Sequence, residues 1–114
     1  MRTNFRMEYE NITMIKGDTL SFNVEVFDQA GEPLEVDEAY FTCKKNINGS
    51  AKAFQKSLGS GITYEDDLLV VRVAPTDTDT LEAGRYFYDL QLVVGSDVYT
   101  PMIGVLTIEQ DVTD

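Results

Sequence analysis

The stretch Leu81-Glu82-Ala83-Gly84-Arg85-Tyr86-Phe87-Tyr88-Asp89-Leu90-Gln91 carries the most specific structural signal in the chain. A short helical turn is expected over residues 76–83, with Thr76 as its N-cap and Gly84 at its end. Beyond Gly84 the side chains of Tyr86, Tyr88 and Leu90 point one way, and those between them point the other way. This two-residue period predicts a long β-strand with one buried face, over residues 85–94.

The same period recurs on both sides of this stretch. It predicts strands over residues 20–26, 39–44, 51–58, 68–73 and 98–108. Asn48-Gly49 is expected to form a type I′ hairpin turn, because this pair readily adopts positive φ angles. Pro101 and Gly104 interrupt the last strand and so predict an edge position or a β-bulge there.

About seven strands without a long helix predict an all-β, antiparallel β-sandwich. A glycine followed by a tyrosine at the start of a long strand is typical of the tyrosine corner of immunoglobulin-like domains, in which the tyrosine hydroxyl bonds to upstream backbone. We assign this role to Tyr86, with Leu81 and Gly84 shaping the corner. The chain has one cysteine and no tryptophan, so the sandwich is immunoglobulin-like without being an antibody domain.

The domain is expected to span residues 12–109. Residues 1–11 are predicted to be a loosely ordered N-terminal segment, and residues 110–114 a flexible C-terminal tail.

The composition argues against enzymatic chemistry. The 114 residues contain no histidine, which excludes His-based nucleophilic triads and His-containing zinc sites. Cys43 is expected to be a free, buried thiol, because no second cysteine exists to pair with it. We therefore predict a non-enzymatic protein with no catalytic residues, no metal site and no cofactor.

The net charge of −11 restricts the partners. Residues 1–61 carry a net charge of −2 and residues 62–114 a net charge of −9. This excess of acid disfavours nucleic acid and anionic membranes. The polar N-terminus lacks the apolar core of a signal peptide, so synthesis in the bacterial cytoplasm is expected.

Four lysines stand out against this acidic background. Residues 39–64 contain no acidic side chain, and the predicted hairpin there carries Lys44, Lys45, Lys52 and Lys56. One interpretation is an edge hairpin that lysines protect from aggregation. The other is an assembly surface, in which the hairpin docks on the acidic C-terminal half of a neighbouring copy.

Two ligand-binding interpretations stay open as alternatives. Glu65-Asp66-Asp67 and Asp77-Thr78-Asp79 offer hard oxygen ligands for Ca²⁺, although neither has a complete calcium-loop spacing. The outward aromatic candidates for sugar stacking are Phe27, Tyr40 and Phe87. Either would make the chain a carbohydrate- or Ca²⁺-binding sandwich of a bacterial surface protein or a carbohydrate-active protein.

A family resemblance favours assembly. The segment Ile12-Thr13-Met14-Ile15-Lys16-Gly17-Asp18-Thr19-Leu20-Ser21-Phe22 resembles the "hydrophobic, Arg or Lys, Gly, Asp, Thr" start of small phage and prophage proteins that are encoded among tail and baseplate genes, including the N-terminal domain of baseplate upper proteins. Three further stretches match in the same order, and the resemblance covers about residues 12–108. They are residues 31–34, 55–62 and 84–91.

The resemblance implies a structural protein of a virion tail or baseplate, with other phage structural proteins, copies of itself, or both as partners. No catalytic residues come with this family.

Overall fold

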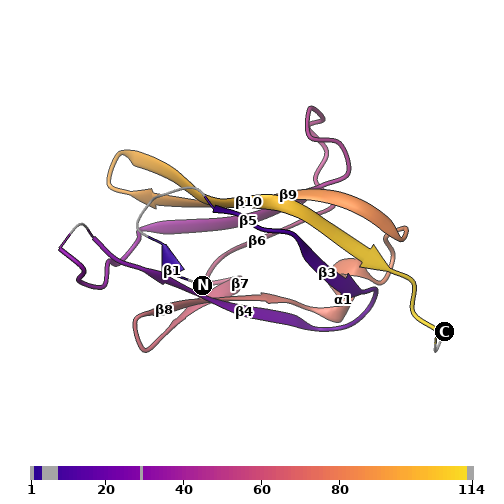
Figure 1. The fold of residues 1–114 in the computed structure, drawn as a ribbon, viewed down its shortest axis with the longest axis horizontal. Helices are drawn as coiled ribbons and strands as arrows, with labels where there is room; N and C mark the ends of the chain where they lie inside the picture. The colour runs from indigo at the N-terminus through magenta and orange to yellow at the C-terminus, as the bar shows by residue number, and fades with distance from the viewer. Residues whose placement is uncertain (1, 4–7, 29, 113–114) are drawn as a thin grey trace.

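The computed structural model describes residues 2–3, 8–28 and 30–112, and the side chains of residues 9–28 and 30–112. The described residues form an all-β structure, with two facing layers of strands and one short helix at the end of the sandwich (Figure 1). Its elements are β1 (Arg2–Thr3), β2 (Glu8–Tyr9), β3 (Ile12–Ile15), β4 (Leu20–Val26), β5 (Glu38–Lys44), β6 (Phe54–Leu58), β7 (Gly61–Glu65), β8 (Leu68–Val73), α1 (Pro75–Thr78), β9 (Gly84–Val94) and β10 (Asp97–Glu109).

The strand order has the arrangement of an immunoglobulin-like sandwich. One layer has the order β1-β4-β8-β7, and the other has β6-β5-β9-β10. In immunoglobulin nomenclature these are strands A-B-E-D and C-F-G, with β6 added beside strand C. The pairing of Ser57 with Gly61 and of Leu58 with Ile62 joins β6 to β7, so hydrogen bonding continues from one layer to the other. The predicted fold class is confirmed.

The core lies between the layers, where the apolar side of each strand faces inward. Phe41 is fully buried at its centre and contacts aromatic rings of both layers. Its ring centroid lies 5.6 Å from that of Phe22 on β4 and 5.2 Å from that of Tyr88 on β9. Cys43 is a buried free thiol in this core, and burial raises its pKa to about 12. It packs as a small apolar side chain.

The N-terminal segment belongs to the sandwich to a greater extent than the sequence suggests. β1 pairs in parallel with β4, and both β2 and β3 pair in parallel with β10. Within the segment predicted to be loosely ordered, residues 2–3 and 8–9 pair with strands of the sandwich, while residues 1 and 4–7 lie outside the described part of the chain. Parallel pairing across such long separations leaves no local pattern in the sequence.

Two turns differ from the prediction. Neither Asn48 nor Gly49 has a positive φ, so the predicted type I′ turn is absent, and residues 45–53 form a longer loop. The tight hairpin instead joins β7 to β8 at Asp66 and Asp67, with φ angles of 51° and 66°. Aspartate tolerates these angles better than most residues because its short side chain can bond locally. The strand β7 itself was not predicted.

The predicted helical turn over residues 76–83 is displaced and shorter. Helix α1 begins at Pro75, whose fixed φ suits the first helical position, and its N-cap is Ala74 rather than Thr76. The Asp77 carboxylate accepts a 2.7 Å hydrogen bond from the N–H of Ala74. The residues after Thr78 form the corner before β9 instead of a second helical turn.

The last strand contains the predicted irregularity. Its register against β9 shifts between Tyr99 and Met102, beside the buried Pro101. Proline removes one backbone donor from the ladder, and the shift accommodates that loss.

Candidate functional site

The outer face of the β5-β9-β10 layer is the strongest candidate site. Since alternate residues of each strand enter the core, the residues between them face solvent. These half-buried outward residues are Tyr40, Thr42 and Lys44 on β5, Phe87, Asp89 and Gln91 on β9, and Ile103, Val105 and Thr107 on β10.

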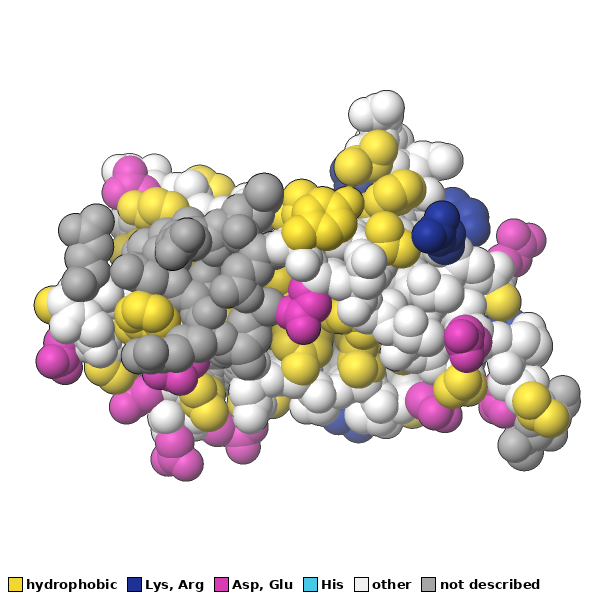
Figure 2. Space-filling view, viewed as in Figure 1, with side chains coloured by type: hydrophobic (Ala, Val, Ile, Leu, Met, Phe, Trp, Pro, Cys, Tyr) yellow, Lys and Arg dark blue, Asp and Glu magenta, His cyan; other side chains and the backbone are white. Residues whose placement is uncertain are grey.

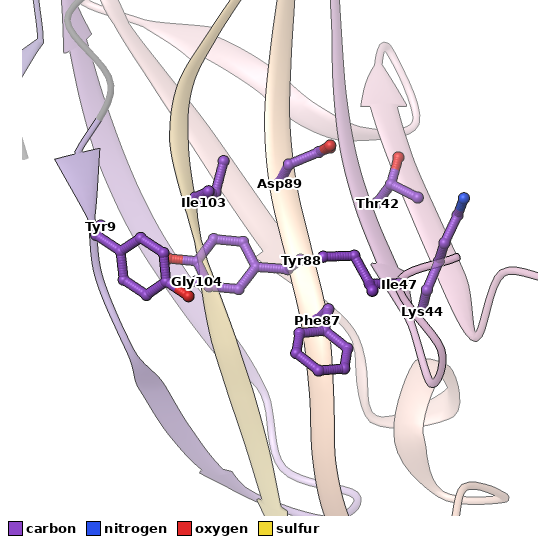
Figure 3. A pocket seen from close by; sticks show the side chains of 9 residues that line it. All are labelled: Tyr9, Thr42, Lys44, Ile47, Phe87, Tyr88, Asp89, Ile103 and Gly104. Carbon is purple, nitrogen blue, oxygen red and sulfur yellow. The ribbon is translucent and has the colours of Figure 1, made fainter. Parts of the chain in front are cut away.

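A hollow of about 170 Å³ lies on this face (Figure 3). Four elements contribute side chains to it, namely β2, β5, β9 and β10, together with the loop of residues 45–53. Among the described residues the lining is mostly apolar, with one acidic and one basic side chain. The lining residues are Tyr9, Thr42, Lys44, Ile47, Phe87, Tyr88, Asp89, Ile103 and Gly104.

The loop of residues 45–53 forms one wall of the hollow. It projects beyond the layer that contains β5 and β9 (Figure 1) and carries Ile47, whose side chain is 66% exposed. The loop is held at its base by a 2.7 Å hydrogen bond from the N–H of Ala53 to the carbonyl of Cys43. Lys44 donates a 3.0 Å hydrogen bond from Nζ to the carbonyl of Gly49, and this contact holds the loop against β5.

The N-terminal segment forms the opposite wall. The pairing of Tyr9 with Ile103 places the Tyr9 ring, which is 68% exposed, at the edge of the hollow. The next residue, Glu10, approaches β10 so closely that a Cβ at Gly104 would overlap its carbonyl oxygen. The Tyr88 side chain passes beside Gly104, and its hydroxyl donates a hydrogen bond to the carbonyl oxygen of Glu10.

Asp89 lines the hollow between β10 and β5 (Figure 3). It pairs with Thr42 on one side and with Ile103 on the other, so one row across the sheet runs Tyr9, Ile103, Asp89, Thr42. Desolvation by the surrounding side chains raises the pKa of Asp89, and the charge of Lys44 opposes this effect. Within the described residues, no hydrogen-bond donor or ion-pairing nitrogen reaches the Asp89 carboxylate.

The four lysines of the predicted assembly surface do not form one patch. Lys44 is committed to the loop, and Nζ of Lys45 lies 4.6 Å from the centre of the Tyr86 ring, a cation–π contact. Lys52 is exposed, with its Nζ 3.5 Å from Gln55. Lys56 lies on the other side of β6, where its Nζ pairs with Asp77 at 2.8 Å. Only Lys45 and Lys52 are therefore exposed on the loop.

Tyr86 makes the contact that a tyrosine corner requires. Its hydroxyl donates a 2.7 Å hydrogen bond to the carbonyl of Glu82, four residues upstream. Leu81 is half-buried against the core, and its N–H bonds to the carbonyl of Thr78. Gly84, the first residue of β9, lies beside Lys45, since a Cβ there would be 3.1 Å from the lysine Nζ. This corner is structural and lies apart from the hollow.

The residues considered for Ca²⁺ and sugar binding occupy separate places. Asp66 and Asp67 form the β7–β8 turn, whereas Asp77 is engaged by Lys56. No group of three or more acidic or cysteine side chains in the described part of the chain is arranged to hold a metal ion. The Tyr40 hydroxyl bonds to the Glu38 carboxylate, and Phe87 is the sugar candidate that lines the hollow.

Acidic side chains lie at both ends of the 47 Å long axis, whereas the described lysines and arginines lie toward one end. The loop between β4 and β5 and the turns β7–β8 and β9–β10 lie at one end, where the described charges are acidic (Figure 2). The described lysines and arginines lie toward the other end, around residues 44–56, Lys16, Arg72 and Arg85, where α1 and the end of β10 also carry acidic side chains.

Comparison with known proteins adds no assignment, since no family model and no curated protein matches the sequence. No helix in the described part of the chain has the length and apolar character that crossing a bilayer requires. The function is therefore inferred from the fold, the geometry of the site and the sequence.

The sequence already placed Phe87 and Asp89 on one outward face, because they alternate with Tyr86, Tyr88 and Leu90. It did not reveal the hollow. The hollow depends on Tyr9, which lies beside β10 because β2 and β10 pair in parallel, and on the loop of residues 45–53, where a tight turn was expected.

Proposed function

We propose that the chain is a non-enzymatic protein–protein interaction module that forms part of a phage or prophage tail or baseplate. The observation that carries this proposal is the hollow on the outer face of the β5-β9-β10 layer, between the exposed side chains of Tyr9 and Ile47. Apolar surface gathered on one face of a small domain is typical of interaction sites. The strands hold this face rigid, so binding requires little ordering of the module.

The tail or baseplate context is supported by the sequence resemblance. Its motifs lie at turns and strand starts, including the β3–β4 turn, where the N–H of Gly17 bonds to the buried Thr78 hydroxyl at 2.9 Å. In this proposal the chain is made in the bacterial cytoplasm and enters the virion by binding neighbouring structural proteins. Symmetry then multiplies contacts that are individually weak.

Co-purification with a neighbouring tail protein tests the proposal. The chain is co-expressed with the products of the genes beside its own, and a tail or baseplate protein is expected to co-purify with it. The double variant Ile47→Ser with Phe87→Ser should lose this partner. Val98→Ser is the matched control, because Val98 is apolar and 60% exposed but lies outside the hollow.

Retention of the partner by the folded double variant would contradict the choice of face. Genes for carbohydrate-active enzymes beside this one, with binding of a glycan and no protein partner, would contradict the choice of function and favour the sugar-binding alternative.

Contact between copies is a second part of the proposal, and it is supported by the end of the sandwich where the described charges are acidic, opposite the end that carries the lysines. The loop that carries Lys45 and Lys52 would face the acidic end of a neighbour in a head-to-tail contact. Light scattering across salt concentrations should show oligomers that dissociate as the salt rises. Charge reversal at Lys45 and Lys52 should abolish them, and a reversed variant that assembles as well as the parent would contradict this contact.

A further inference from the structure

Asp89 is the least satisfied charged group on the proposed binding face. Its carboxylate is half-buried among apolar side chains, with Phe87 two residues before it on β9 and Ile103 opposite it on β10. A desolvated carboxylate is unfavourable unless hydrogen bonds or an opposite charge compensate it. Among the described residues none does so by direct contact.

The two polar side chains of β5 that line the hollow bond to other groups and make no hydrogen bond with the Asp89 carboxylate. The Thr42 hydroxyl oxygen accepts a 2.9 Å hydrogen bond from Gln55, on the side away from Asp89. Nζ of Lys44 donates to the carbonyl of Gly49. Both contacts orient these side chains toward other groups. The Asp89 carboxylate oxygens can therefore accept hydrogen bonds from a partner molecule.

The chemistry of the lining restricts that group. A purely apolar ligand would bury the carboxylate further without a partner. A Ca²⁺ ion needs six or more oxygen ligands, and the lining residues that the structure describes supply one carboxylate. A cationic side chain with an apolar stem fits both the apolar side chains and the carboxylate of the lining. Its stem would pack against the apolar side chains, and its charged head would pair with the Asp89 carboxylate.

We propose that the hollow around Asp89 binds an arginine or lysine side chain of a partner protein, with the cationic head on the Asp89 carboxylate and the stem against Phe87 and Ile103. Arginine fits better than lysine, because its planar guanidinium can bond to both carboxylate oxygens and also stack on an aromatic ring. The net charge of −11 steers cationic segments toward the chain. This inference rests on the proposed function and specifies the chemistry of the partner.

A pair of small probes tests the inference on the whole protein. Nα-acetyl-arginine methylamide carries the cation, and Nα-acetyl-citrulline methylamide has nearly the same shape without the charge. Each probe is titrated into the ¹⁵N-labelled chain, and amide shifts are followed at residues 42–44, 87–89 and 103–104. The arginine probe should shift these amides with a Kd about tenfold lower than that of the citrulline probe.

Two variants assign the preference to the carboxylate. Asp89→Asn should bind both probes equally, whereas Asp97→Asn, which removes an exposed carboxylate outside the hollow, should keep the tenfold preference. The dispersion of each variant's amide spectrum shows whether it is folded. Equal binding of the two probes by the parent, or an unchanged preference in Asp89→Asn, would overturn the inference.

Other occupants give distinct outcomes. Shifts at the same amides that grow with protein concentration, in the absence of a probe, would assign the hollow to a second copy and overturn the inference. Stronger shifts with N-acetylglucosamine than with the arginine probe would also overturn it. If the probes fail but the Ile47 and Phe87 double variant still loses its co-purified partner, the interface stands and only the cationic chemistry is rejected.

Discussion

The Tyr88 hydroxyl donates a 2.5 Å hydrogen bond to the carbonyl oxygen of Glu10, which lies 78 residues earlier in the chain. This contact connects the middle of β9 to the N-terminal segment across β10, and the absence of a side chain at Gly104 leaves room for it. Burial raises the pKa of Tyr88, so the hydroxyl keeps its proton and remains a donor. The contact therefore holds Tyr9 at the edge of the hollow.

Gly104→Ala should detach this segment. The added Cβ would overlap the Glu10 carbonyl, and we expect a loss of about 1–3 kcal/mol in the free energy of unfolding. Hydrogen exchange should show faster exchange over residues 9–15. Gly49→Ala is the control, because its φ is not positive and its nearest neighbours lie at ordinary contact distance. A segment that exchanges as slowly in Gly104→Ala as in the parent would contradict this account.

Tyr86→Phe tests the tyrosine corner. It removes the hydroxyl that bonds to the Glu82 carbonyl, with an expected loss of about 1 kcal/mol in chemical denaturation. Tyr40→Phe also removes a hydroxyl, but its hydrogen bond to Glu38 is exposed, so its effect should be within about 0.5 kcal/mol. A loss within about 0.5 kcal/mol for Tyr86→Phe would contradict a stabilising role for the corner hydrogen bond.

Charge reversal separates two lysines that the sequence grouped together. Lys56→Glu should destabilise the fold by about 1–3 kcal/mol, because its pairing with Asp77 is mostly shielded from water, with side-chain exposures of 16% and 17%. Lys52→Glu should leave stability within about 0.5 kcal/mol, because its side chain is exposed. Urea denaturation of both variants measures the difference, and the reverse order of effects would contradict the placement of Lys56.

Asp89→Asn should stabilise the free protein while it weakens binding. The raised pKa means that the folded state binds this proton more tightly than the unfolded state. Protonated Asp89 therefore favours the folded state relative to ionised Asp89. This part of the free energy of unfolding is fully present below the ordinary carboxyl pKa of 3.8, and it is lost as the pH rises through the raised pKa of the folded state. At neutral pH the variant should gain about 0.5 kcal/mol after allowance for solvent screening, or roughly 2–4 °C in Tm.

The Tm difference between this variant and the parent should grow across that pH interval, as differential scanning calorimetry can measure. Among the described residues, Lys44, Tyr9 and Tyr88 are the titratable groups that line the hollow together with Asp89. Asp97→Asn is the control and should show no such growth. A difference that is constant with pH would mean that burial of the Asp89 charge has no cost in the folded state.

Local sequence patterns were sufficient for the elements whose two faces differ. Residues 20–26 alternate cleanly, and β4 has those bounds. The expected strand over residues 85–94 and the irregular last strand near Pro101 are also present. In each case one side of the strand must be apolar to face the core, so the period is visible without knowledge of its neighbours.

Tertiary contacts determined the rest. Strand β3 and the pairing of Tyr9 with Ile103 depend on an edge of β10 that a local pattern does not reveal. The Asn48-Gly49 pair favours a hairpin turn, but the longer loop is held by Lys44 and by the backbone of Ala53. The hollow needs both features, which is why Asp89 could be placed on a face but not in a site.

The most direct test of the proposed binding face is hydroxyl-radical footprinting of the co-purified complex against the free chain. We expect oxidation of Tyr9, Ile47 and Phe87 to fall in the complex, while Val98 and Val70, on the outward side of β8, react as they do in the free chain. Protection of Val70 instead, with the hollow still reactive, would contradict the account.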